Sequence, residues 1–365
     1  MLNFAATKVA FDLIRTPITG IGLMCGTSHD ALDIAIVKFL YNDDIWSFDL
    51  LGAASANLTL ELKSKLAIAT DMSAVDYVKL DRDFARFCAK SVKDLGRDSL
   101  ETIDFIASHG VTVFHQPQNG ITTQIGSGAV ISVLTGLPVV SDFRIQDVTK
   151  GGQGAPLVPF ADKKLFSEYD ATINLGGFAN ITLLSDTVLK GYDIAPCNKT
   201  LNHFYTHAGF EGEFDQDGVF ARSGKIDKNL LRNINELDYF NQLPPKSLGH
   251  EWFVSQFLPQ IPHMVNTADL LSTLTENIAL QIAKNLPSNG KALFTGGGTF
   301  NSFLLERIQH HSSCLCIVPD SNIIEYKEAI EFAFLGALRI LNQTNIDRNV
   351  TGATSNSIAG ALYLP

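Results

Sequence analysis

Two stretches of the chain share one pattern of apolar and polar positions. The first, Ile21–Val37 (IGLMCGTSHDALDIAIV), starts apolar, turns polar at Gly26-Thr27-Ser28 and becomes apolar again. The second, Ala171–Leu184 (ATINLGGFANITLL), repeats this course around Gly176-Gly177. Each pattern predicts a strand, a tight turn and a returning strand. Because the two units lie about 150 residues apart, we expect two similar domains that face a common cleft.

Other segments alternate between strand-like and helix-like spacing, which is typical of an α/β protein. The strongest helical pattern is 73–95, where apolar residues form one stripe between charged ones. Further helices are expected at 58–70, 129–135, 270–284, 301–309 and 328–341. Further strands are expected at 45–56, 103–109, 122–125, from 137, 291–294, 314–318 and in the terminal ALYLP.

The first turn carries the clearest candidate chemistry. A small, hydroxyl-rich turn between strands brings backbone N–H groups and hydroxyls close to an anion. The nearby acids Asp30 and Asp33 suggest that a divalent cation accompanies that anion, so a phosphate with Mg²⁺ is the obvious ligand. An ordinary hairpin with a polar turn explains this short pattern equally well.

Four other places stand out, each with a plainer structural explanation. His109 follows a predicted strand, where α/β proteins usually bind ligands, although single histidines are more often structural. The glycine-rich loop at 151–154 favours a binding loop over an interdomain linker, and we place the domain boundary near it. Asp193 is expected to end a short strand, as a proton acceptor or as a turn cap, with Asn198 capping the next helix. The run Gly296-Gly297-Gly298 is expected to leave a helix N-terminus bare for an anion or a flat ring.

Composition narrows the class of protein. The 365 residues suffice for two domains, and the formal charge of −10 argues against a broad nucleic-acid surface. The five cysteines are odd in number and lack zinc-finger spacing, so we expect free thiols in a reducing compartment. Charged residues interrupt the apolar N-terminus and no run is long enough to span a membrane, so we expect a cytoplasmic protein without membrane contact.

Taken in order, the motifs resemble those of the anhydro-N-acetylmuramic acid kinases, which belong to the superfamily of hexokinase, actin and the Hsp70 ATPase domain. The resemblance covers nearly the whole chain, and ten motifs in the family order are hard to obtain by chance. They are GLMCGTSHDALD (22–33), SHGVTVFHQP (108–117), DFRIQDVTKGGQGAPLVP (142–159), INLGGFANITLL (173–184), GYDIAPCN (191–198), DQDGVFARSGK (215–225), PPKSLGHEWF (244–253), LFTGGGTFN (293–301), EAIEFAFLGA (328–337) and VTGA (350–353).

The resemblance implies an α/β fold of two RNase H-like (actin-like ATPase) domains, whose mixed five-stranded sheets flank a central nucleotide cleft. The N-terminal lobe would comprise residues 1–141 and 341–365, and the C-terminal lobe residues 142–340. It implies a kinase that uses ATP and Mg²⁺ to phosphorylate O6 of the sugar while water opens the 1,6-anhydro ring at C1. The product would be N-acetylmuramate 6-phosphate, in the recycling of peptidoglycan, and the enzyme would be a homodimer.

The resemblance also implies roles for individual residues. Asp193 would be the general base that deprotonates the attacking water. Nucleotide and metal would contact Gly26, Thr27, Ser28, His29, Asp30, Ala31, Leu32 and Asp33, with Asp30 and Asp33 nearest the metal. Gly176 and Gly177 would hold phosphates, and Gly296, Gly297 and Gly298 would lie along the adenosine. The substrate would contact His109, Thr112, Gln153, Asn198 and Glu328.

The chain departs from the family pattern at four positions beside these sites. Ala31 stands where the family usually has Gly, Cys25 stands where it has Ser, and Ala195 and Cys197 replace the two glycines of its GPGN motif. An added Cβ can block a positive φ or a close backbone approach, but the acids and Asn198 remain, so we expect an active kinase. Two alternatives stay open: a kinase of the same fold that acts on another sugar, and a nucleotide-binding sensor with weakened catalysis.

Overall fold

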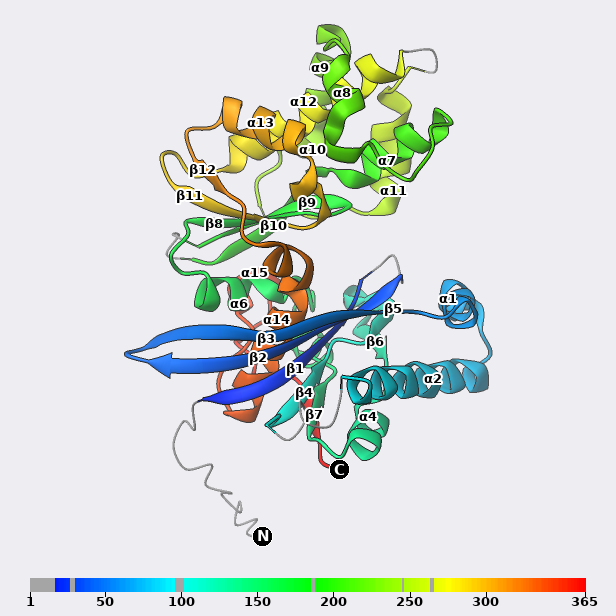
Figure 1. Ribbon diagram of the computed structural model, residues 1–365, viewed down its shortest axis with the longest axis vertical. Helices are drawn as coiled ribbons and strands as arrows, with labels where there is room; N and C mark the ends of the chain where they lie inside the picture. Colours follow the sequence, from blue (N-terminus) through cyan, green and yellow to red (C-terminus); the bar gives the residue numbers. More distant parts are fainter. Residues whose placement is uncertain (1–16, 27–29, 96–101, 185–187, 245, 263–265) are drawn as a thin grey trace. The chain divides into compact units, whose positions relative to one another are not determined.

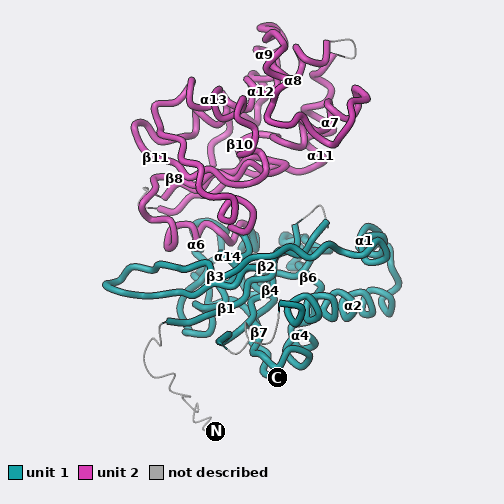
Figure 2. Tube along the Cα trace, in the orientation of Figure 1, with its two compact units in different colours: residues 1–155, 328–365 teal, residues 156–327 magenta. Residues whose placement is uncertain are grey.

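A computed structural model of the chain describes residues 17–26, 30–95, 102–184, 188–244, 246–262 and 266–365. These residues form two compact units (Figure 2): unit 1 comprises residues 1–155 and 328–365, and unit 2 comprises residues 156–327. The predicted α/β fold with two mixed sheets is confirmed, although the sheets contain six and five strands rather than five each. The division also differs from the predicted boundaries at 141/142 and 340/341.

The main sheet of unit 1 has the order β13-β7-β4-β1-β2-β3 (Figure 1). Its strands are β1 (Ile18–Cys25), β2 (Ala31–Asn42), β3 (Ile45–Asn57), β4 (Phe105–Ser108), β7 (Val139–Ser141) and β13 (Ala361–Tyr363). The first three are antiparallel neighbours, β4 runs parallel to β1, and β7 runs parallel to β4. The terminal ALYLP segment docks as expected, because β13 pairs antiparallel with β7. A separate hairpin joins β5 (Val111–Gln116) to β6 (Ile121–Ile125).

The five-stranded sheet of unit 2 has the order β10-β9-β8-β11-β12. Its strands are β8 (Ala171–Leu175), β9 (Phe178–Leu183), β10 (Lys190–Pro196), β11 (Lys291–Thr295) and β12 (Leu315–Ile317). Strands β8, β9 and β10 are antiparallel neighbours, as β1, β2 and β3 are in unit 1. On the other side of β8, β11 pairs with it in parallel, and β12 pairs in parallel with β11. The two units therefore share one strand order, which agrees with the repeat expected from the two hairpin patterns.

Alternation along β1 decides which helix covers which face of the sheet in unit 1. Ile21 and Leu23 join a buried apolar cluster with α1 (Leu60–Ala67), α2 (Ala74–Lys93) and α4 (Gly128–Thr135). Gly20 and Gly22 face the other way. A Cβ on Gly22 would lie 1.8 Å from the carbonyl oxygen of Ala329, so this glycine lets α14 (Ser321–Ile340) approach the sheet backbone.

The same contacts explain why the division differs from the predicted one. Residues 328–340 of α14 pack on the β-sheet of unit 1 through positions such as Ala329 and Phe334. Residues 142–155, which include α5 (Ile145–Thr149), are tied to the C-terminal segment of unit 1. Thr351 in α15 (Arg348–Thr351) donates to Asp147 at 2.7 Å, and the N–H of Gln153 donates to the carbonyl of Thr351 at 2.8 Å.

In unit 2 the sheet lies between helices in the same alternating way. Ile181 faces a buried cluster to which several helices contribute, while Thr182 on the opposite face donates to Asp162 of α6 (Val158–Leu165) at 2.7 Å. The remaining helices of unit 2 are α7 (Asn198–His207), α8 (Val219–Ser223), α9 (Lys228–Asn235), α10 (Asp238–Asn241), α11 (His250–Trp252), α12 (Thr267–Asn285) and α13 (Ser302–His311).

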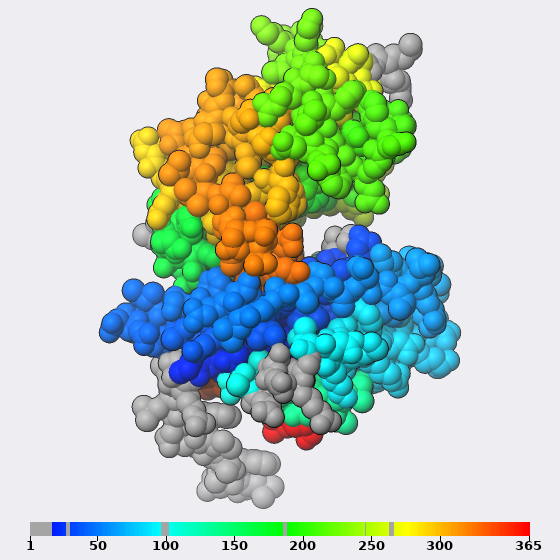
Figure 3. All heavy atoms as spheres, viewed as in Figure 1, coloured from blue at the N-terminus to red at the C-terminus, as the bar shows by residue number. Residues whose placement is uncertain are grey.

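Several local predictions need correction. The stripe of α2 is buried from Leu80 onward, but Val75 and Val78 are exposed near its N-terminus. The strand at 314–318 shortens to β12, an edge strand whose Leu315 is exposed. In unit 1 the long edge strand β3 is partly exposed along its length, and Figure 3 shows the blue surface of this part of the chain. All five cysteines are free thiols, as predicted.

Candidate functional site

The turn between β1 and β2 is the first predicted site. Thr27, Ser28 and His29 lie outside the described residues, whereas Gly26 and Asp30 border the turn on either side. The carboxylate of Asp30 pairs with Lys63 at 2.8 Å, and its carbonyl accepts from the N–H of Leu58 at 3.0 Å. The hydroxyl of Ser55 on β3 donates to Asp33 at 2.6 Å. The acids are therefore oriented by neighbouring side chains, within reach of solvent.

The electrostatics of this turn suit a cation. The buried thiol of Cys25 has a pKa raised to about 12, mainly by burial and further by the charges of Asp33 and Asp30. Carboxylate oxygens are the protein ligands that Mg²⁺ prefers, and it usually takes only one or two beside water and phosphate oxygens. Within the described ranges no group of three or more His, Cys, Asp or Glu residues could form a closed metal cage. This donor set fits Mg²⁺ bound together with a phosphate.

Ala31 has an extended backbone, so the Cβ that it adds in place of Gly is tolerated. It is the first residue of β2 and pairs with Asn57 of β3. Ala31 is also absent from the residues with a positive φ, which include Asp43, Asp44 and Asp142. Since extended backbone accepts any side chain, the added methyl group causes no strain at this position.

The turn between β8 and β9 is fastened to the start of α7. The carbonyl of Gly177 accepts from the N–H groups of Cys197 at 2.8 Å and Lys199 at 3.2 Å. The carbonyl of Gly176 accepts from the N–H of Asn198 at 3.1 Å. Asn198 is thus the first residue of α7 and not its cap, which corrects the prediction. Its side-chain amide instead donates to the carbonyl of Leu175 at 2.9 Å.

The glycine run after β11 packs against the same turn. Gly296 has φ +81°, and a Cβ there would lie 2.2 Å from Oδ1 of Asn174. A Cβ on Gly298 would lie 2.8 Å from Oδ1 of Asn198 and 3.0 Å from the carbonyl oxygen of Leu175. The fold of unit 2 therefore brings Gly176, Asn198 and the run 296–298 together, although they lie far apart in the sequence.

The helix after this run does not have the bare N-terminus that we expected. A short 3₁₀ turn, Gly297–Phe300, precedes α13. Oδ1 of Asn301 then accepts from the N–H of Leu304 at 3.0 Å, and Asp217 accepts from the N–H of Ser302 at 2.9 Å. Because these side chains accept hydrogen bonds from the first N–H groups of the helix, those groups are not free to bind an anion. A ligand can therefore contact the backbone of the glycine run but not the N-terminus of α13.

Asp193 lies inside β10, which corrects the prediction that it ends the strand. The pairing with β9 shifts register between Asp193 and Ala195, which marks a β-bulge. The N–H of Leu248 donates to Oδ2 of Asp193 at 2.8 Å, and the hydroxyl of Tyr239 donates to its backbone carbonyl at 2.7 Å. Burial raises the pKa of Asp193, and the Leu248 hydrogen bond opposes the rise only in part. A desolvated carboxylate with one hydrogen bond is a stronger base than a solvated one.

The predicted substrate residues of unit 1 gather around a residue that we had not selected, Arg144. Nε and Nη2 of Arg144 lie 3.2 and 2.7 Å from Nε2 of His109, and its Nη1 donates to the carbonyl of Gly154 at 2.6 Å. Burial lowers the pKa of Arg144 to about 10, while the nearby charge of Glu328 opposes this shift. His109 is only 6% exposed, and burial together with the Arg144 charge lowers its pKa well below the ordinary value.

The other two substrate candidates flank this group. Thr112 on β5 accepts from the side chain of Gln124 at 3.3 Å, in the hairpin that follows His109. Gln153 is exposed in the glycine-rich loop, where the N–H of its neighbour Gly154 donates to Asp147 at 2.8 Å. Of the predicted residues, His109, Thr112, Gln153 and Glu328 belong to unit 1, whereas Asp193 and Asn198 belong to unit 2. Arg144 is not among the predicted site residues, although it lies shortly before the glycine-rich loop in the sequence.

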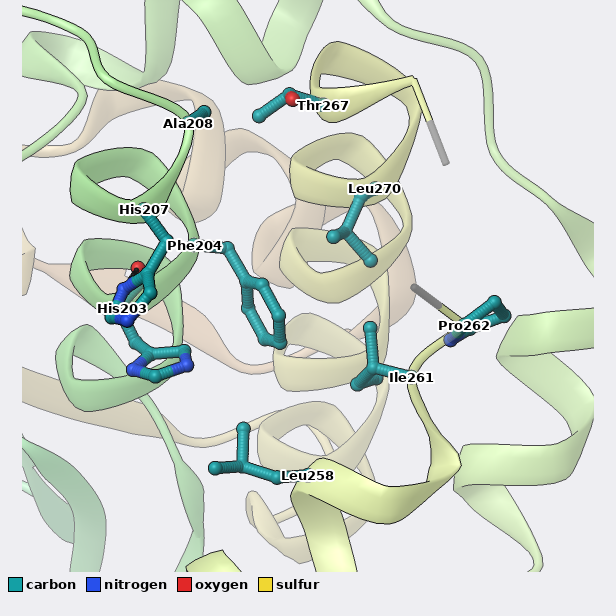
Figure 4. A pocket seen from close by; sticks show the side chains of 9 residues that line it. All are labelled: His203, Phe204, His207, Ala208, Leu258, Ile261, Pro262, Thr267 and Leu270. Atoms are coloured by element: carbon teal, nitrogen blue, oxygen red, sulfur yellow. Dashed lines mark hydrogen bonds between the residues drawn. The ribbon is translucent and has the colours of Figure 1, made fainter. Parts of the chain in front are cut away.

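Two cavities of unit 2 are lined by other residues. One of ≈470 Å³ is lined by side chains of α7, α12 and the segment between them (Figure 4). Its lining comprises His203, Phe204, His207, Ala208, Leu258, Ile261, Pro262, Thr267 and Leu270. Another of ≈540 Å³ is lined by residues 236–242 and 252–256, among them Tyr239, whose hydroxyl touches the backbone of Asp193. Neither cavity contains a predicted site residue in its lining.

No helix in the described part of the chain has the length and apolarity needed to cross a membrane. The profile of the family described as anhydro-N-acetylmuramic acid kinase matches residues 19–365. Proteins with that name from Aliivibrio fischeri and Idiomarina loihiensis are each 35% identical, over 94% of this chain and 98% of theirs. Among solved structures, a gluconate kinase from Lactobacillus acidophilus aligns at a TM-score of 0.42 with 11% identity, over 95% of this chain and 93% of that one.

Proposed function

The chain belongs to the anhydro-N-acetylmuramic acid kinase family, and we propose that it opens 1,6-anhydro-N-acetylmuramic acid with water and phosphorylates O6 with ATP. The product is N-acetylmuramate 6-phosphate, a step in the recycling of peptidoglycan. The relatives at 35% identity match nearly end to end, and Asp30, Asp33, Asp193 and Asn198 are all present in this chain. We further propose that the protein is a homodimer in the cytoplasm.

The observation that carries the proposal is the environment of Asp193. Its carboxylate is largely desolvated, accepts one backbone N–H from Leu248 and has a raised pKa. In the reaction the oxygen of water bonds to C1 while its proton passes to Asp193, and the bond between C1 and O6 breaks. O6 then takes the γ-phosphoryl group, and ADP leaves. Each bond that forms is matched by one that breaks, and Asp193 is the only added base the step requires.

The phosphate groups of ATP are assigned to the two hairpin turns, and its adenosine to the run 296–298. In unit 2 the close packing of Gly296 and Gly298 on Asn174 and Asn198 leaves backbone rather than side chains to meet the ligand. In unit 1, Asp30 and Asp33 would hold Mg²⁺, which screens the charge of the phosphates during transfer. Lys63 and Ser55 orient these two acids before any ligand arrives.

The direct test incubates the purified chain with ATP, Mg²⁺ and 1,6-anhydro-N-acetylmuramic acid in water enriched in ¹⁸O. The proposal predicts that ADP forms in step with a sugar 6-phosphate that carries one ¹⁸O at C1 and none in the phosphate. Omission of the sugar should leave ATP nearly intact, because no acceptor oxygen is then released.

Two matched sugars separate the alternatives. N-acetylmuramic acid and N-acetylglucosamine have an ordinary O6 hydroxyl and no anhydro bridge. Faster turnover of either one than of the anhydro sugar would identify a kinase for another sugar. Binding of ATP without turnover of any of the three would identify a nucleotide sensor. Both results would contradict the proposed function.

A further inference from the structure

Arg144 interacts with three segments that carry predicted substrate positions of unit 1. It hydrogen-bonds His109 directly, hydrogen-bonds the carbonyl of Gly154 beside Gln153, and interacts electrostatically with Glu328. These positions come from three separate segments of the chain, near residues 109, 153 and 328. The sequence indicated each position separately and did not indicate what holds them in register.

The contact with His109 fixes the chemistry of the imidazole. A guanidinium group has five N–H donors and no acceptor, so Nε2 of His109 must present its lone pair to Arg144. The ring is buried, and burial and the charge of Arg144 both lower its pKa, so it stays neutral. A neutral imidazole with a bare Nε2 carries its proton on Nδ1. A hydrogen bond with the backbone of Gly110 raises the pKa of the ring, but this effect is smaller than the two that lower it.

The same geometry argues against the predicted role of His109 as a direct substrate contact. Its ring is 6% exposed and lies 4.6 Å from that of Phe332, centroid to centroid. Nδ1 is buried inside the protein. Arg144 is less buried than His109. Its hydrogen bonds to the described residues use three of its five N–H donors, which leaves two for a ligand oxygen.

From these contacts we infer that Arg144 is a positioning residue that assembles the sugar subsite of unit 1, with His109 as its buried, neutral Nδ1–H anchor. The inference rests on the proposed function for the identity of the sugar, but the Arg144–His109 contact is a property of the protein alone. Arg144 fixes the glycine-rich loop through Gly154 and sets Glu328 beside a fixed positive charge. His109 acts on the substrate only through Arg144.

The first experiment reads the tautomer in the absence of any ligand. ¹⁵N NMR of histidine-labelled protein, with His109 identified from His109→Gln among nine histidines, should show an unprotonated Nε2 and a protonated Nδ1. In Arg144→Met, which keeps a side chain of similar length without donors, Nε2 should become protonated in part of the population. A wild-type ring protonated at Nε2 would overturn the inference, whatever the enzyme does.

The second experiment separates positioning from folding in the active enzyme. Arg144→Lys keeps the charge but loses the planar guanidinium with its fixed set of N–H donors. KM for the anhydro sugar should therefore rise at least about tenfold while KM for ATP stays nearly constant. His109→Gln retains an acceptor for Arg144 and should keep most of the sugar affinity, whereas His109→Leu should lose it as Arg144→Lys does. Equal sugar affinity in all variants would overturn the inference. If the wild type turned over no anhydro sugar, the proposed function would fail, but the tautomer result would still decide the inference.

Discussion

The hairpins of the two units have the same place in the same strand order but use different means to prepare a site. In unit 2 the turn at Gly176-Gly177 is held by three backbone hydrogen bonds from the start of α7 and is packed against a second glycine run. In unit 1 the turn after Gly26 is flanked by two acids, each oriented by a side chain from the segment that follows: Lys63 for Asp30 and Ser55 for Asp33.

The two copies of the strand–turn–strand framework are therefore held in different ways. The unit 2 turn depends on shape, because Gly296 and Gly298, in the run that packs against it, leave no space for a side chain. The unit 1 turn depends on charge, because its acids create a negative potential that also acts on the thiol of Cys25. Mutations should therefore affect the two turns differently. In unit 2 they should introduce strain, and in unit 1 they should weaken cation binding.

The largest effect on stability is expected from Gly296→Ala. Its φ of +81° disfavours any L side chain, and the new Cβ would lie 2.2 Å from Oδ1 of Asn174. We expect the free energy of unfolding, measured by urea denaturation, to fall by about 3 kcal/mol. Gly26→Ala is the matched variant of unit 1: no described heavy atom lies within 4 Å of its Cβ, so the change should stay within about 0.5 kcal/mol. Equal losses in the two variants would remove the proposed contrast.

A smaller and more specific effect is expected from Asp33→Asn. Loss of the charge should raise the Mg²⁺ concentration for half-maximal activity about tenfold while the unfolding curve stays unchanged. Asp49→Asn, an exposed acid on the adjacent strand β3, serves as the control and should leave the Mg²⁺ requirement as it is. In unit 2, Asn198→Ala should raise KM for the anhydro sugar without changing that requirement. A shifted Mg²⁺ requirement in Asn198→Ala would mean that the metal is not organised by unit 1 alone.

The smallest effect concerns stability and pH. The pKa of Asp193 is raised in the folded chain, so folding favours its protonated form. This contribution is complete below the unfolded pKa and is lost as the pH rises through the folded value. At neutral pH the ionised carboxylate therefore lowers stability, and Asp193→Asn should raise the Tm slightly. The difference in Tm between Asp193→Asn and the wild type should shrink as the pH is lowered toward about 4. A lower Tm for the variant at neutral pH would contradict the desolvation argument.

Local patterns predicted most of the framework correctly, since strand–turn–strand alternation depends on neighbours in sequence. They predicted both hairpins, the helix at α2 and the terminal strand β13, and the ordered motifs predicted the family. What they missed depends on contacts between distant segments. The cap that Asp217 provides for α13, the bulge at Asp193 and the Arg144–His109 bond each join residues whose proximity only the fold creates.

The domain boundaries were missed for the same reason. Residues 142–155 have the composition of a linker, yet Asp147 binds Thr351, more than 200 residues away, and holds the loop in unit 1. The helical pattern around 328–341 does not reveal that one glycine, Gly22, opens the sheet of unit 1 to receive α14. In both cases contacts with residues distant in the sequence tie the segment to unit 1.

The central claim is that unit 2 supplies the base of the reaction through Asp193, and the kcat of Asp193→Asn on the anhydro sugar tests it most directly. Asp170→Asn is the matched control, because Asp170 also accepts a backbone N–H in unit 2, from Lys291 at 2.9 Å, but lies before the start of β8. We predict that Asp193→Asn lowers kcat at least about 10³-fold with its fold intact, while Asp170→Asn stays within about threefold of the wild type. A folded Asp193→Asn enzyme with wild-type kcat would contradict the account.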